Sequence, residues 1–321
     1  MKGCLTILVI LVSCLISNIE AQTFHLILAG DDSDKKNITD IISDLHAVEE
    51  AFTYLTSVNK MPLSIHRLPK DRYSPLSRSI IEKEIDKMSV AHDDIIVFYY
   101  TGHGCRTRNT KTIWPNALLH NEIIPFSQIT EKLFEKKAAL YVVILDCCNT
   151  LYGKGQNREN RRVFTLQQYD KHRIIAGFQK LFTKSKGLII ASAASPYGYA
   201  YHGVFSGILL NNLFDVLQSK SPRWDTVLQK TKDEAHKETK KGHLTNNPSA
   251  PKPPQTPQYK IFLWHYRRSA DTYRKYLNKY KADKKGKSSP APHEQEIEEE
   301  NIQDDDLFLN EPEPEEIENG Q

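Results

Sequence analysis

Two apolar stretches that each end on chemically reactive residues constrain the fold of this 321-residue chain more than any other feature. Residues 95–100 read IIVFYY and residues 139–145 read ALYVVIL, without the polar–apolar alternation that a half-exposed strand shows. Uninterrupted apolar strands are typical of parallel sheets, because helices cover both faces of such a sheet. The sequence therefore predicts that both stretches are buried strands.

Segments with strand and helix periodicity alternate along most of the chain. The patterns predict strands at residues 23–29, 63–68, 94–100, 139–145, 187–193 and 259–264, and helices at residues 38–58, 75–88, 127–136, 205–218 and 223–240. Residues 151–186 read as loop-rich and basic. Alternating strands and helices predict the α/β class, here a three-layer α-β-α sandwich around a mostly parallel six-stranded sheet.

The N-terminus has the composition of an export signal. Lys2 gives it a basic start, residues 5–16 are apolar, and a small-residue cleavage site ends at Ala21. We therefore expect residues 1–21 to be a signal peptide, which leaves an exported protein, secreted or periplasmic, without a stable membrane span. An alternative is a lipid anchor, because the residues ending at Cys14 (LVSC) resemble a bacterial lipoprotein box.

Charge divides the chain into a basic body and an acidic end. Residues 294–321 contain 13 acidic and no basic residues, so a net charge of +3 for the whole chain leaves +16 on the rest. The positive charge is scattered and no nucleic-acid-binding motif accompanies it, so we predict no nucleic-acid partner. We expect residues 22–268 to form one domain and residues 269–321 a basic, then acidic, disordered tail, either solvated or docked on the basic body.

Reactive residues follow the two apolar strands. The first strand continues into Thr101-Gly-His103-Gly104, and the second into Asp146-Cys-Cys148. Since functional residues of open parallel sheets gather beyond the carboxyl ends of the strands, we expect His103 and Cys148 to face one cleft. An imidazole beside a thiol can take its proton and later protonate a leaving amine. The backbone N–H groups of Gly104 and Cys148 would form an oxyanion hole.

Two other readings of these residues remain. His103 can be a packed core histidine, although flanking glycines suit that role poorly. Removal of the signal peptide would leave three cysteines: Cys105, Cys147 and Cys148. This odd number, with two of the three adjacent, fits neither a disulfide framework nor the usual zinc-ligand spacings. A cysteine used for chemistry is therefore the favoured interpretation.

The order of these motifs resembles the caspase and metacaspase branch of cysteine peptidases, with its caspase–haemoglobinase fold. Besides TGHG and DCC, the resemblance rests on HAVEEA (46–51), GLIIASAASPYGYAYHGVFSGILLNNL (187–213) and QTPQY (255–259), and it covers residues 24–266. It implies a cysteine endopeptidase with His103 as base and Cys148 as nucleophile. Cys147 should point to the opposite side of the strand, because side chains alternate.

The resemblance also implies a substrate pocket. Asp146 and Thr101 match its walls and Glu50 matches a second acidic wall, so the pocket would select Lys or Arg before the scissile bond. Alternatively, Asp146 caps a turn or pairs with a lysine. Asn149 and Thr150 replace the residues that usually follow the nucleophile.

The remaining expectations concern partners and processing. The resemblance implies calcium-binding aspartates after the histidine, but residues 104–145 contain no Asp, so we predict no calcium dependence. We also predict no other metal and no cofactor. The basic stretch 151–173 reads either as an exposed loop or as a self-cleavage segment, because a peptidase that prefers basic residues would find several of them there. A homodimer through the sheet edge beyond the last strand follows from fold analogy. The alternative to an active peptidase is an inactive scaffold or effector of the same fold, which binds partners.

Overall fold

The computed structural model describes residues 22–31, 38–70, 74–119, 122–151, 164, 168–201, 203–240, 254–263 and 269–283. The predicted signal peptide, most of the predicted self-cleavage stretch and the acidic end of the chain lie outside the described residues. The structural findings below concern the described ranges only.

A six-stranded sheet forms the centre of the fold. Its strands lie in the order β2-β1-β3-β7-β8-β9, and all neighbours are parallel except β8 and β9. The strands are β1 (Phe24–Gly30), β2 (Leu63–Leu68), β3 (Ile95–Thr101), β7 (Leu140–Asp146), β8 (Gly187–Ser192) and β9 (Gln258–Leu263). The predicted mostly parallel, six-stranded sheet is confirmed, and the two apolar stretches are adjacent central strands.

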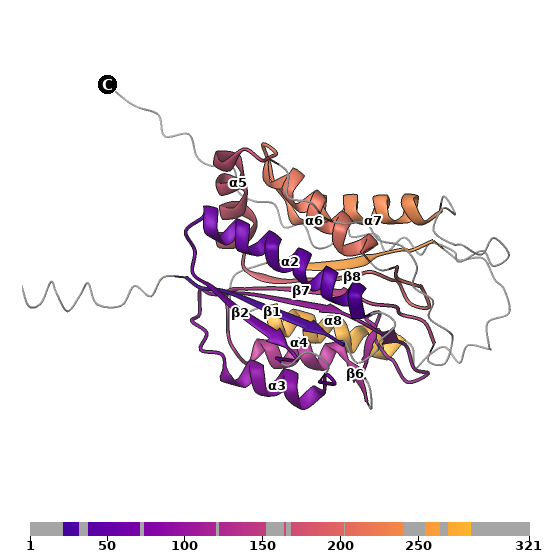
Figure 1. The fold of residues 1–321 in the computed structure, drawn as a ribbon. Coiled ribbons are helices and arrows are strands. Elements are labelled where there is room, and N and C mark those ends of the chain that lie inside the picture. Colours follow the sequence, from indigo (N-terminus) through magenta and orange to yellow (C-terminus); the bar gives the residue numbers. More distant parts are fainter. Residues whose placement is uncertain are drawn as a thin grey trace, which may run out of the picture.

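Helices cover both faces of the sheet, which confirms the three-layer sandwich (Figure 1). One face carries α2 (Ile38–Val58), α5 (Lys171–Phe178) with the π-helical turn η1 (Gln179–Thr183), α6 (Val204–Leu217) and α7 (Trp224–Lys240). The other face carries α3 (Arg78–Lys87), α4 (Phe126–Phe134) and α8 (Ser269–Asp283). A small antiparallel sheet of β4 (Gly104–Cys105), β5 (Asn116–Leu118) and β6 (Ile123–Pro125) follows β3.

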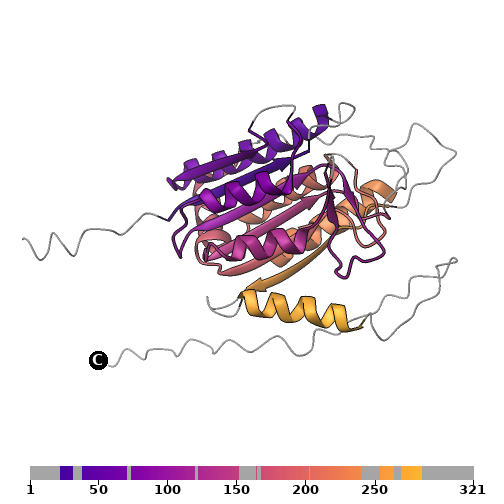
Figure 2. The same cartoon turned by 90° about the horizontal axis from the view of Figure 1, so that it is seen from below.

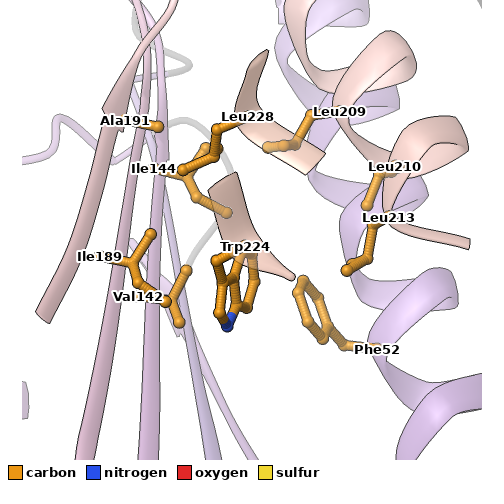
Figure 3. Close-up of a pocket in the computed structure, with 10 residues that line it drawn as sticks. All are labelled: Phe52, Val142, Ile144, Ile189, Ala191, Leu209, Leu210, Leu213, Trp224 and Leu228. Carbon is orange, nitrogen blue, oxygen red and sulfur yellow. The ribbon is translucent and has the colours of Figure 1, made fainter. Parts of the chain in front are cut away.

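Strand side chains alternate between two separate apolar cores. In β7, Val142 and Ile144 face the α2–α7 side, whereas Tyr141 and Val143 face the α3–α8 side. Figure 3 shows an apolar cavity in the first core, with Trp224 of α7 between the sheet and α2. Burial of both strand faces explains why the sequence lacks alternation there.

Helix α5 was not predicted, because it has only eight residues and lies in a stretch that otherwise reads as a basic loop. Ile174 and Phe178 are spaced by four and buried, and they pack into the core under α6. Asp170 caps the helix, since its carboxylate accepts hydrogen bonds from the backbone N–H groups of His172 (2.9 Å) and Arg173 (3.3 Å).

Helix α8 lies within residues 269–321, for which the sequence predicts a tail. Tyr273 and Leu277 are spaced by four and buried in the second core. The Tyr273 ring packs edge-on against Phe134 (5.7 Å between centroids) and Phe262 (5.8 Å). Figure 2 shows α8 beside β9. These contacts attach α8 to the second core. None of the helices described here is long and apolar enough to cross a membrane.

Candidate active site

The predicted site residues follow strand ends that lie side by side. Thr101 and Asp146 end β3 and β7 and are paired in the parallel register. Gly102 then turns the chain away from β3 with φ of 151°, and a Cβ there would lie 2.8 Å from the Tyr100 hydroxyl. Only glycine suits that backbone and that space, so Gly102 allows the sharp exit that leads to His103.

The chain after His103 lies directly against the chain around Cys148. A Cβ on Gly104 would lie 2.2 Å from the Cys148 carbonyl oxygen and 2.6 Å from the Cys147 sulfur. Two residues later, the N–H of Arg106 donates to the Thr150 carbonyl at 2.6 Å. The two reactive segments are therefore in backbone contact.

His103 is half-buried and its backbone is fixed from two sides. Its carbonyl accepts hydrogen bonds from the Tyr100 hydroxyl (2.7 Å) and from the backbone N–H of Leu118 in β5 (3.0 Å). The small sheet thus holds the histidine segment against the end of β3.

Cys148 and Cys147 lie on opposite sides of the strand extension, as side-chain alternation predicts. Cys147 is buried in the α3–α8 core, and Cys148 lies in the α2–α7 core with 1% of its surface exposed. The Cys148 sulfur accepts a hydrogen bond from the Ala200 N–H at 3.3 Å and lies 3.6 Å from the Ala200 carbonyl oxygen. The segment after β8 therefore contacts the sulfur directly.

A buried acidic cluster lies on the Cys148 side of the sheet. Asp146 accepts a hydrogen bond from the Tyr99 hydroxyl at 3.4 Å, and Asp44 of α2 accepts one from the Thr101 hydroxyl at 3.3 Å. Burial raises the pKa of the Tyr99 phenol well above its ordinary value, and the negative charges of Asp146 and Asp44 raise it further. Two carboxylates therefore converge on a neutral tyrosine beside the strand ends.

Asp44 of α2 belongs to this buried acidic cluster, and Glu50 of the same helix does not. Glu50 is exposed and lines a hollow on the outer side of α2 with His46, Tyr54 and neighbouring residues. The sequence carries a signal for Asp44, because it interrupts the buried stripe of Ile41, Val48 and other apolar residues of α2. An acid in such a stripe faces the core, and only a nearby polar group makes that position favourable.

Asp31 is a further acid at this edge that the sequence analysis did not select. It directly follows β1, is buried, and its N–H donates to the Thr101 carbonyl at 3.4 Å. Its position beyond a strand end is the signal that would have found it.

The described residues contain no group of three or more His, Cys, Asp or Glu side chains arranged to hold a metal ion. Cys105, Cys147 and Cys148 are all free thiols. Burial raises the pKa of Cys105 to about 11, so it stays protonated at neutral pH and does not compete as a nucleophile.

A layered α/β fold with a histidine and a cysteine after adjacent parallel strands defines a protein of the caspase type. The sequence model of the caspase domain matches residues 12–263, so the chain belongs to the caspase family of cysteine peptidases. A search of curated proteins finds no match. Helix α8 lies beyond the matched residues.

Proposed function

We propose that this protein is a cysteine endopeptidase that cleaves peptide bonds after Lys or Arg, with His103 and Cys148 as its catalytic pair. The observation that carries the proposal is the backbone contact between Gly104 and Cys148, which joins the histidine and cysteine segments at one edge of the sheet. Family membership supports protein substrates and peptide hydrolysis.

The catalytic steps follow from the chemistry of the two side chains. The His103 imidazole accepts the proton of the Cys148 thiol, and the sulfur attacks the carbonyl carbon of the scissile bond. The backbone N–H groups of Gly104 and Cys148 donate to the oxyanion that forms. The imidazolium protonates the leaving amine, the carbon–nitrogen bond breaks, and water then hydrolyses the thioester.

The acidic cluster supports a preference for basic residues before the cut. Asp44 and Asp146 are 6% and 2% exposed, and both charges lie on the face of the sheet that carries Cys148. A Lys or Arg side chain brings positive charge to these carboxylates, whereas an acidic side chain is repelled by them. The Tyr99 and Thr101 hydroxyls hold one oxygen of each carboxylate in place.

Fluorogenic peptides test both parts of the proposal. The wild-type protein, Cys148→Ala and Cys147→Ala are incubated with peptides that differ only in an Arg, Lys or Asp residue before the reporter group. We expect turnover of the Arg and Lys peptides by the wild type and Cys147→Ala, and none by Cys148→Ala. Equal turnover by the wild type and Cys148→Ala would refute the nucleophile, and turnover of the Asp peptide alone would refute the specificity.

A further inference from the structure

Two carboxamides, one buried and one half-buried, meet beside the nucleophile on residues far apart in the sequence. Asn149 directly follows Cys148 and is fully buried, and Gln258 is the first residue of β9. The Asn149 Nδ2 group donates to the Ile113 carbonyl at 2.8 Å and to the Ala194 carbonyl at 3.4 Å. The Gln258 Nε2 group donates to the same two carbonyls, at 2.7 Å and 3.3 Å.

We propose that Asn149 and Gln258 are positioning residues, which hold Cys148 in place through these shared carbonyls. We call this arrangement the amide clamp. Its importance for peptide hydrolysis rests on the proposed function, whereas its role in fixing the Cys148 segment does not.

The clamp joins three segments that surround the nucleophile. Ile113 belongs to the loop between β4 and β5, Ala194 belongs to the segment after β8, and Asn149 belongs to the segment after β7. Backbone hydrogen bonds extend the contact, because the Asn149 N–H donates to the Gly198 carbonyl (3.0 Å) and the Tyr197 N–H to the Asn149 carbonyl (2.8 Å). The position of the Cys148 peptide N–H therefore depends on groups from three loops.

The clamp also fixes the segment that contacts the sulfur. Ala200, whose N–H donates to the Cys148 sulfur, lies six residues after Ala194 in the same segment. The Ser195 N–H donates to the Thr256 carbonyl at 2.7 Å, two residues before Gln258. The clamp therefore fixes both segments that meet at the sulfur: the segment after β7 through Asn149, and the segment after β8 through Ala194.

Carboxamides suit this position because each NH₂ group carries two donors and can serve two carbonyls at once. Each of the two carbonyls accepts a hydrogen bond from both amides, so loss of one amide leaves both carbonyls hydrogen-bonded. Loss of both removes every clamp bond to Ile113, whose carbonyl then lacks these partners in a partly buried site. The two residues should therefore act non-additively.

The test compares Asn149→Leu, Gln258→Met and the double variant, which remove the donors at nearly constant side-chain volume. The matched control is Asn212→Leu, because Asn212 is also a buried amide but donates to Glu234 between α6 and α7. Amide hydrogen exchange is followed at Asn149 and Tyr197, and kcat and KM are measured with the Arg peptide.

Each single substitution should lower kcat about 10-fold with KM almost unchanged, and the double variant should lose about 1,000-fold, more than the product of the singles. Exchange at the two amides should accelerate most in the double variant and stay slow in Asn212→Leu. Independent effects of the singles with unchanged exchange would overturn the clamp, as would an equal loss of kcat in the control.

The two proposals fail separately in this experiment. If the wild type and Cys148→Ala turn over the peptide equally, the peptidase proposal fails, and the exchange rates alone decide the clamp. If the wild type is active but the double variant keeps its kcat, the clamp fails and the peptidase proposal stands.

Discussion

The closeness of the two reactive segments predicts a large effect of one methyl group at Gly104. A Cβ at this position would lie 2.2 Å from the Cys148 carbonyl oxygen, about 1.2 Å short of an ordinary contact of 3.4 Å. The nearest atoms are backbone or short side chain, so neither segment can yield by rotating a flexible group. In Gly104→Ala the segments must separate by about 1 Å, and a misplacement of that size costs about 100-fold in rate.

Gly177→Ala is the matched control for this substitution. A Cβ on Gly177 of α5 would lie 2.1 Å from the Leu217 carbonyl oxygen of α6, an equally severe overlap away from the site. Overpacking should lower the free energy of unfolding by about 1–3 kcal/mol in both variants. Only Gly104→Ala should also lose kcat/KM.

The assay combines chemical denaturation with peptide hydrolysis at a temperature where both variants are folded. A Gly104→Ala protein with wild-type kcat/KM would refute the reasoning, because the segments would then tolerate separation. Equal losses of kcat/KM in both variants would also refute it, because the effect would then reflect stability and not the geometry of the site.

Three further predictions concern other parts of the chain. Cys147→Ala should lower the free energy of unfolding by about 1 kcal/mol and leave kcat unchanged, as measured by denaturation and hydrolysis. Burial lowers the pKa of His25, so the unfolded chain binds a proton near pH 6.5 before the folded one does. Stability should fall as the pH drops below about 6.5, and denaturation of His25→Gln should show a smaller fall. Mass spectrometry of the purified protein should find Gln22 as the first residue and a cut after a basic residue within 151–173; an intact N-terminus and an uncut chain would contradict these two expectations.

Much of the fold could be predicted because local patterns and tertiary structure agree. The predicted helix at residues 38–58 matches α2, and the strand predicted at 63–68 matches β2. Helices α5 and α8 were missed for a common reason. Each offers only a few buried residues, such as Phe178 and Tyr273, and these attach it to cores whose other parts are distant in the sequence.

The site could be predicted only where strand ends specify it. His103 and Cys148 follow two strands that pair in register, so the topology brings them to one edge. The amide clamp could not be predicted, because Asn149 and Gln258 meet only through the carbonyls of two other loops. Backbone acceptors carry no side-chain signal, and their positions depend on the completed fold.

The proposal that Asp44, rather than Glu50, forms an acidic wall of the substrate pocket gives the sharpest test of the proposed specificity. Both acids lie on α2, but Asp44 bonds to Thr101 at the end of β3, whereas Glu50 is exposed on the outer side. A charged hydrogen bond in a buried site contributes about 1.5–3 kcal/mol. Asp44→Asn should therefore raise KM for the Arg and Lys peptides about 10- to 100-fold, and Glu50→Gln should change it less than two-fold. A larger effect of Glu50→Gln than of Asp44→Asn would restore the sequence-based assignment. If KM changes in neither variant, α2 does not line the substrate pocket.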